Sequence, residues 1–262
     1  MQAENVQAMR GSIPTCGIAI MAKASVLGRC KTRLVPPLTF EEAARCNTAF
    51  LRDIADNILA ASRAASIAGY AAFGPPPARS FFEQNLPLEI GLIDAWYPDF
   101  GDCLSATVEQ LLARGHRTAV LVNCDSPTLP TSLLVETAQI LERSGDCAVL
   151  GPADDGGYYL IGLRATHPRL FEEIAWSTDR VARQTLDRAA ELKLPVHVLP
   201  QWYDVDDAGT LQMLSAELFE EASFAHDLRP NRAHYTRAVL QSLFEGSDLH
   251  DRLARAPQRA AE

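Results

Sequence analysis

The chain has 262 residues and a formal net charge of −9, with 47% hydrophobic and 22% charged residues. This length suits one large domain, or a domain with an appendage, and the composition is that of an ordinary soluble globular protein. The negative charge disfavours general binding to nucleic acids or anionic membranes, so an anionic ligand needs a local cluster of positive charge. No apolar run reaches the length of a membrane span, and residues 1–15 lack the apolar centre of a secretory signal.

The six cysteines form no CxxC pair and no metal-ligand spacing, and the six histidines show no H-x-x-x-H spacing. We therefore predict neither disulfides nor a zinc site, and we expect a cytoplasmic protein. A hydrolase triad is disfavoured because the chain has no G-x-S-x-G elbow. Lysine is rare: only three of the 24 basic residues are lysines, and two of them, Lys23 and Lys31, fall in one short loop.

Apolar runs of strand length alternate with longer helical patterns along most of the chain. Cys16–Ala22 is a continuous apolar run, typical of a strand covered on both faces. Thr39 and Glu42 form a capping box at the start of a long helical pattern. In chain order we predict strands at 16–22, 67–73, 88–93, 118–123, 147–152, 158–163 and 196–199, and helices at 39–62, 80–84, 104–114, 131–144, 180–192, 208–220 and 231–244.

This alternation predicts an α/β domain with a mainly parallel central sheet flanked by helices. In such sheets ligands bind beyond the carboxyl ends of the strands, so the residues that follow each strand become the candidate site. We predict a flexible leader at 1–15, this domain at 16–222, and a helical C-terminal extension at 223–262.

A basic loop at 23–34 follows the first strand and carries four positive charges and no acid. Nucleotide-binding α/β folds bring backbone amides to phosphates at this position. Lys31 would act on a phosphate as a point charge and Arg33 as a planar fork, with Lys23 beside them, and Gly28 would let the backbone approach the ligand. The spacing matches neither the P-loop nor G-x-G-x-x-G, and a solvated charged loop is the alternative.

The candidate metal-binding aspartates follow two of the predicted strands. Asp125 comes directly after the strand at 118–123, where a carboxylate suits a hard cation such as Mg²⁺ (or Mn²⁺); a turn residue is the alternative. Asp204 and Asp206 follow the last strand, and either could complete a cation site with Asp125. One of the aspartates in this segment is also expected to cap the next helix.

Two more segments carry candidate acceptor-binding residues. Between the strands at 147–152 and 158–163, adjacent glycines permit a tight backbone path against a ligand, although Asp-Gly is also a hairpin signal. Ahead of the helix at 180–192, two hydroxyl side chains could bind an acceptor or cap that helix. The candidates are Gly156, Gly157, Tyr158, Ser177 and Thr178.

With these segments the chain resembles the rSAM/selenodomain-associated transferases, a branch of the nucleotide-diphospho-sugar transferase superfamily with a Rossmann-like GT-A fold. The basic loop and the Asp-x-Pro turn are also similar to those of 2-phospholactate and molybdenum-cofactor guanylyltransferases. The chain departs from the family at Ser25, where proline is usual, and at 101–105, which lacks a Gly-Glu-Arg ending. The matching pieces, which span roughly Thr15–Leu218, are Met21–Leu34, Cys124–Leu129, Gly151–Leu160, Trp176–Thr178 and Asp204–Asp206.

The resemblance implies a Mg²⁺-dependent transferase in which the basic loop holds nucleotide phosphates and Asp125 ligates the metal with Asp206. We favour nucleotidyl transfer from an NTP to a phosphorylated or phosphonate small molecule, with release of pyrophosphate. The attacking oxygen is then already anionic, so catalysis needs only positioning and charge neutralisation by Mg²⁺ and by Lys31, Arg33 and Lys23. Nucleic acids and membranes are not expected partners.

Glycosyl transfer from an NDP-sugar is the alternative, with Asp155 as the candidate base for an acceptor hydroxyl. Many metal-dependent glycosyltransferases of this fold have a D-x-D pair, whereas this chain has Asn123 at that distance before Asp125. A second alternative is a non-catalytic nucleotide-binding module. A homodimer is left open.

Overall fold

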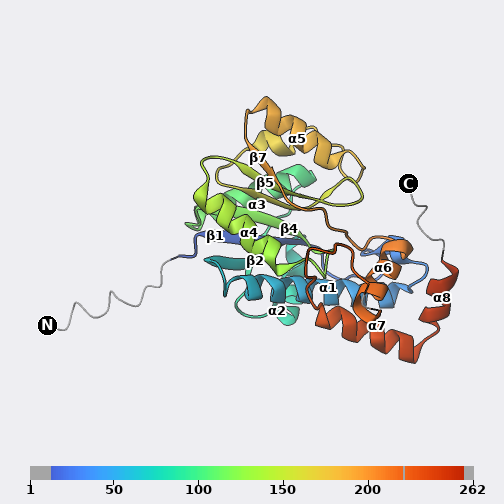
Figure 1. The fold of residues 1–262 in the computed structure, drawn as a ribbon. Helices are drawn as coiled ribbons and strands as arrows, with labels where there is room; N and C mark the ends of the chain where they lie inside the picture. Colours follow the sequence, from blue (N-terminus) through green and yellow to red (C-terminus); the bar gives the residue numbers. More distant parts are fainter. Residues whose placement is uncertain (1–12, 221, 257–262) are drawn as a thin grey trace.

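A seven-stranded sheet with the order β3-β2-β1-β4-β6-β5-β7 runs through the computed structural model, which describes residues 13–220 and 222–256 (Figure 1). Helices cover both faces of this sheet. The strands are β1 (Cys16–Ala22), β2 (Ile67–Phe73), β3 (Gly91–Asp94), β4 (Thr118–Asn123), β5 (Ala148–Pro152), β6 (Tyr158–Leu163) and β7 (Val196–Val198).

The predicted mainly parallel sheet is confirmed. β1 pairs in parallel with β2 and β4, and the β2–β3 and β5–β7 pairs are also parallel. Only β6 runs antiparallel, to both β4 and β5. The connection from β5 to β6 is a short turn, closed by a hydrogen bond from Ala153 N to Gly157 O, and a parallel crossover needs a much longer segment.

The predicted helices are present, and the differences concern the residues at which some of them begin or end. The capping box of Thr39 and Glu42 is present. The third helix begins before the predicted Leu104 because Asp99 caps it and accepts a hydrogen bond from Gly101 N at 2.7 Å. The last helix lies outside the predicted ones. The helices are α1 (Phe40–Ala61), α2 (Arg79–Asn85), α3 (Phe100–Ala113), α4 (Thr131–Arg143), α5 (Val181–Glu191), α6 (Ala208–Phe219), α7 (His234–Gly246) and α8 (Leu249–Arg255).

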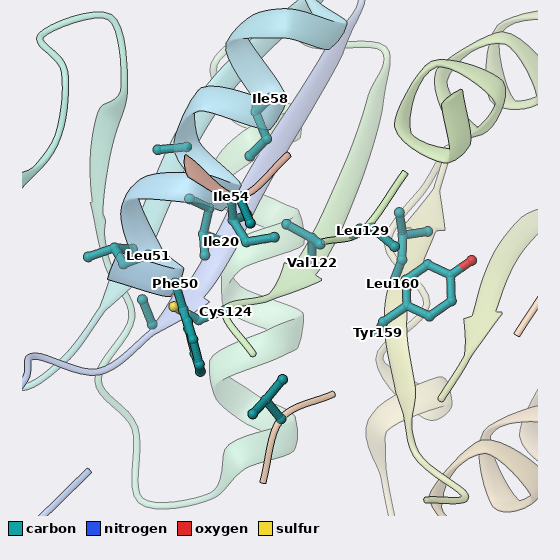
Figure 2. Close-up of a cluster of buried hydrophobic side chains, with 14 of the residues drawn as sticks. Ile20, Phe50, Leu51, Ile54, Ile58, Val122, Cys124, Leu129, Tyr159 and Leu160 are labelled. Carbon is teal, nitrogen blue, oxygen red and sulfur yellow. The ribbon is translucent and has the colours of Figure 1, made fainter. Parts of the chain in front are cut away.

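Two apolar layers hold the helices to the sheet. On one face, Ile54 of α1 points toward Ile20 of β1 and Val122 of β4, and Phe50 lies beside Cys124, which follows β4 (Figure 2). On the opposite face α3 and α5 pack against the sheet, and this apolar layer contains fewer buried side chains. β1 and β4 are buried on both faces, which explains why their sequences are continuous apolar runs.

The C-terminal helices are part of the α1 layer. The N-cap residue of α7 is Ala233, which offers no side-chain cap. Asp53 of α1 supplies the cap instead, because its carboxylate accepts hydrogen bonds from Tyr235 N at 3.0 Å and Thr236 N at 2.8 Å. In α8, Arg252 pairs with Glu42 of α1 at 2.8 Å and also donates to Pro37 O.

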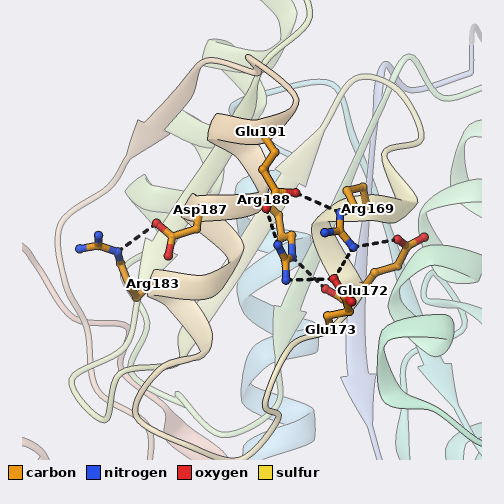
Figure 3. Close-up of polar contacts among 7 residues, drawn as sticks. All are labelled: Arg169, Glu172, Glu173, Arg183, Asp187, Arg188 and Glu191. Carbon is orange, nitrogen blue, oxygen red and sulfur yellow. Dashed lines mark hydrogen bonds and ion pairs between the residues drawn. The ribbon is translucent and has the colours of Figure 1, made fainter.

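A surface ion-pair cluster joins α5 to the short helix η4 (Pro168–Phe171) (Figure 3). Arg169 of η4 pairs with Glu173 at 2.6 Å and with Glu191 of α5 at 3.1 Å. Arg188 of α5 also pairs with Glu173, at 3.1 Å. Since these carboxylates are exposed, each pair contributes little to stability alone, but together they fix η4 against α5.

Parts of the predicted ends lie outside the described residues, namely 1–12 of the leader and 257–262 of the extension. The six cysteines are free and buried. In the part of the chain that the structure describes, no helix combines the length and the apolar character that crossing a bilayer requires.

Replacing Asp53 with alanine is expected to lower the free energy of unfolding by about 2 kcal/mol, because two backbone N–H groups of α7 lose their partner. Urea unfolding measures the change. Asp227→Ala, which removes an exposed aspartate, serves as the control and should leave the value unchanged within about 0.5 kcal/mol. Equal stability of the two variants would contradict the capping role.

Candidate functional site

Side chains from three separate segments meet beyond the carboxyl ends of β1 and β4. They line a cavity of about 640 Å³. The loop after β1 contributes Lys23, Lys31 and Arg33, the turn after β4 contributes Asp125, and the segment after β7 contributes Asp206. The structure therefore brings together five of the residues predicted from the sequence.

The ammonium group of Lys31 lies at the centre of this group. Its Nζ atom is 2.8 Å from Asp125 Oδ1 and 2.8 Å from Asp206 Oδ1. It also donates a hydrogen bond to the carbonyl oxygen of Val205 at 2.8 Å. The Lys31 side chain is only 5% exposed, and its backbone lies in the left-handed region with a φ of 48°. In this structure the Lys31 ammonium therefore contacts two carboxylates and one carbonyl oxygen.

A backbone hydrogen bond explains why the two distant aspartates meet. Val205 N donates to Asp125 O at 2.8 Å, which joins the segment after β7 to the end of β4. One step earlier, Trp202 forms a parallel bridge to Ala153 after β5. Asp207, the next residue along, is the N-cap of α6 and forms a capping box with Thr210. The structure thus assigns the helix cap to Asp207 and directs Asp206 to Lys31.

Burial and mutual charge shift the ionisation of the group. Burial alone would lower the pKa of Lys31, but Asp125 and Asp206 outweigh it and raise that pKa above its ordinary value. The ammonium therefore stays charged at neutral pH. Burial raises the pKa of Asp125, against the opposing charge of Lys31. Burial, and then the charges of Asp155, Asp206 and Asp125, raise the pKa of Asp204 to about 7.

The oxygens around the ammonium suit a hard cation. Two carboxylate oxygens and one carbonyl oxygen lie at 2.8 Å from a single atom. Oxygen donors of this kind are the ligands that Mg²⁺ prefers, and Mg²⁺ usually takes only one or two carboxylates from the protein. Across residues 13–220 and 222–256 no cluster of three or more His, Cys, Asp or Glu side chains has a metal-binding arrangement. A cation here would draw its remaining ligands from phosphate and water.

Side chains of α1 anchor the start of the basic loop. Ser25 Oγ accepts hydrogen bonds from Asn47 Nδ2 at 2.9 Å and from Thr48 Oγ1 at 2.7 Å. Asn47 also donates to the carbonyl oxygen of Lys23 at 3.3 Å. The serine at this position therefore fixes the loop to α1 through its hydroxyl. Gly28 lies at the exposed part of the loop with a φ of +69°, a conformation that favours glycine.

A second cavity, of about 190 Å³, adjoins the first at Asp125. Gly156 is placed differently from the other candidates: its φ is +88°, and an added Cβ atom would lie 2.1 Å from the carbonyl oxygen of Asp179. Its bare backbone therefore accommodates Asp179, and Gly156 does not line the cavity. The predicted residues that do line it are Asp125, Asp155, Gly157, Tyr158, Ser177, Thr178 and Asp204.

Several cavity residues had no predicted role. Trp96 and Tyr97 follow β3, are 59% and 42% exposed, and line the larger cavity. The indole of Trp96 lies over Gly74, where an added Cβ atom would be 2.5 Å from the ring. Asn123 lines both cavities, and its Oδ1 atom is buried without a hydrogen-bond partner. The rule that sites follow strand ends, applied to β3, would have found the two aromatic residues.

Comparisons with known proteins support the fold. A family profile described as an uncharacterized protein conserved in bacteria (DUF2064) matches residues 57–178, less than half of the chain. No curated protein sequence matches the chain. A solved structure from Desulfovibrio desulfuricans, named as a candidate nucleotide-diphospho-sugar transferase, is similar with a TM-score of 0.74 and 24% identity; the match covers 92% of this chain and 97% of that one.

Two more distant structures are also similar. A cytidylyltransferase from Leptospira borgpetersenii has a TM-score of 0.50 and 8% identity, over 94% of this chain and 99% of that one. A CMP:2-keto-3-deoxy-manno-octonic acid synthetase complexed with CTP has a TM-score of 0.50 and 10% identity, over 79% of this chain and all of that one. At these identities the likeness establishes the fold, and the predicted Rossmann-like nucleotide-diphospho-sugar transferase fold is confirmed.

Replacing Lys31 with methionine leaves Asp125 and Asp206 facing each other without a cation. Because the two carboxylates are partly exposed, we expect the free energy of unfolding to fall by about 1–2 kcal/mol in EDTA. Excess Mg²⁺ should restore much of this loss, since ligand binding to the folded state stabilises it. Urea unfolding with and without Mg²⁺ measures both effects.

Lys193→Met is the matched control, because Lys193 is exposed and distant from the two aspartates in the fold. It should show neither the loss nor the recovery. A Lys31→Met protein that Mg²⁺ does not stabilise more than the wild type would contradict a cation position between the two carboxylates.

Proposed function

We propose that the protein is a divalent-cation-dependent transferase whose donor substrate is a nucleotide. The observation that carries this proposal is the convergence of Asp125, Asp206 and the Val205 carbonyl on one cationic position beside the basic loop. This position lies beyond the carboxyl ends of the strands, where α/β sheets bind their ligands.

The larger cavity has the charges that a nucleotide diphosphate or triphosphate requires. Lys23, Arg29 and Arg33 line it from the loop, and the loop contains no acid. A divalent cation bound at the two carboxylates would neutralise phosphate charge there. Lys31, released from its carboxylates, would then donate hydrogen bonds to phosphate oxygens. The names of the similar structures, which include a cytidylyltransferase and a synthetase complexed with CTP, are consistent with a nucleotide donor.

Two reactions fit this donor site. The sequence favours nucleotidyl transfer to a phosphorylated or phosphonate acceptor, partly because Asn123 stands where a D-x-D pair would place a second carboxylate. Asp206 supplies a second carboxylate next to Asp125, so the missing D-x-D pair no longer counts against glycosyl transfer from an NDP-sugar. The cytoplasmic location and a homodimer stay predictions.

Calorimetry with nucleoside diphosphates and triphosphates tests the donor site. We expect binding that requires Mg²⁺, and we expect Asp125→Asn to weaken the Mg²⁺-dependent binding by about 100-fold, since it removes a charged ligand while keeping the shape of the side chain. Turnover with NTPs or NDP-sugars should fall in parallel. Asp227→Asn, an exposed aspartate outside both cavities, is the control for charge.

The fold of Asp125→Asn is checked by circular dichroism and urea unfolding. Mg²⁺-dependent nucleotide binding of wild-type strength in this variant would refute the role of Asp125. The absence of binding of any nucleotide by the wild-type protein would refute the proposed function as a whole.

A further inference from the structure

The smaller cavity differs in charge from its neighbour. Three carboxylates line it, from Asp125, Asp155 and Asp204. Among the described residues that line it there is no lysine, arginine or histidine. The larger cavity, in contrast, takes four basic side chains from the loop after β1. The larger cavity therefore combines basic side chains with Asp125 and Asp206, whereas the smaller cavity is lined by carboxyl groups without a basic side chain.

An anionic acceptor is disfavoured in the smaller cavity. A phosphate there would approach the carboxyl groups of Asp155 and Asp204 with no basic side chain in the cavity wall to pair with it, and burying an unpaired charge is costly. Like charges at close range in a partly buried site also repel more strongly than in water. A phosphate would be accommodated far better in the larger cavity beside Lys23 and Arg33.

The smaller cavity offers strong hydrogen-bond acceptors in its carboxyl groups, next to hydroxyl groups that can donate or accept. Ionised carboxylates accept and do not donate, so a partner that supplies hydrogen-bond donors is favoured when these groups are ionised. Asn123 Oδ1 is also an acceptor, and it is buried without a partner at the junction of the two cavities. A buried acceptor of this kind costs free energy until a donor reaches it.

Aromatic rings form the apolar part of the wall. Phe100 and Trp176 pack edge to face with their ring centroids 5.1 Å apart, and Tyr158 lies in the same cavity. Such rings offer apolar surface next to the carboxylates. A polyhydroxylated molecule complements this wall. Its hydroxyl groups can donate hydrogen bonds to the carboxylates, and its C–H surface can pack against the rings.

We propose that the smaller cavity binds the acceptor and that the acceptor is an uncharged, polyhydroxylated molecule of the sugar or polyol class. This inference rests on the proposed function, because it assigns the larger cavity to the nucleotide donor. The two substrates meet where the cavities join, at Asn123, Asp125 and Ser177. An anionic acceptor, which nucleotidyl transfer to a phosphate would require, does not fit this site.

An acceptor of this class favours glycosyl transfer. The acceptor hydroxyl oxygen forms a bond to the anomeric carbon of the NDP-sugar, and the bond from that carbon to the β-phosphate oxygen breaks. The nucleoside diphosphate leaves with the electron pair of that bond. The hydroxyl proton passes to a carboxylate, and Asp155 and Asp204 both line the cavity in which the hydroxyl is held.

The test uses matched pairs of acceptors with the protein saturated by Mg²⁺ and a nucleoside diphosphate. Glucose, mannose and glycerol are compared with their monophosphates by ligand-detected NMR. We expect the neutral members to bind at least about tenfold more tightly than their phosphates, which corresponds to about 1.4 kcal/mol. Tighter binding of the phosphates, or binding of neither member of any pair, would overturn the proposal.

Reversing the charge of one residue in the cavity wall distinguishes a local effect of this cavity from an effect of net charge. Asp155→Lys changes an exposed residue at the cavity wall and should reduce the preference for neutral molecules by about tenfold. Asp227→Lys makes the same change in net charge at an exposed site outside the cavities and should leave the preference unchanged. Equal effects of the two substitutions would contradict a local origin.

Calorimetry of the Mg²⁺-nucleotide complex is run on the same samples. Retained nucleotide binding with the wrong acceptor preference overturns only the acceptor assignment, whereas loss of nucleotide binding from the wild-type protein overturns the proposed function itself. With NDP-sugars and the bound neutral acceptor, release of the nucleoside diphosphate is expected. Release of pyrophosphate from an NTP with a phosphorylated acceptor would instead establish nucleotidyl transfer.

Discussion

The ammonium of Lys31 between Asp125 and Asp206 is the interaction on which the site depends. It joins the loop after β1, the turn after β4 and the segment after β7, which are distant in the sequence. Two carboxylates and one ammonium leave one negative charge uncompensated. A divalent cation in the same position would balance both carboxylates and release Lys31 toward a phosphate. The Lys31 ammonium thus keeps the site assembled, and under the proposed function the residual charge would favour its exchange for Mg²⁺.

The same geometry also determines which charged side chains line each of the two cavities. Asp125 lies at the border of the two cavities, with the basic loop on one side and Asp155 and Asp204 on the other. Val205 is hydrogen-bonded to Asp125, and its neighbours Asp204 and Asp206 line different cavities. One short segment therefore supplies a carboxylate to the cation position and another to the proposed acceptor cavity.

Local patterns predicted most of the fold, whereas the site required contacts between distant segments. The apolar run of β1 and the capping box of Thr39 predicted their elements correctly, since both depend on neighbours in the sequence. Lys31 and Asp125 could be found as residues that follow strands, but their contact with Asp206 depends on the Val205–Asp125 hydrogen bond. Spacing likewise could not show that the bare backbone of Gly156 accommodates Asp179.

The residues that anchor the basic loop lie outside residues 57–178, the segment that matches the family profile. Asn47 of α1 binds its start, and Arg252 of α8 binds Glu42 and the Pro37 carbonyl just beyond its end. Of the three side chains at the cation position, only Asp125 falls within residues 57–178. Under the proposed function, similarity confined to that segment therefore covers only part of the nucleotide site. The presence of a lysine after the first strand, and of an aspartate in the segment that returns to β4, is the sharper criterion for shared chemistry.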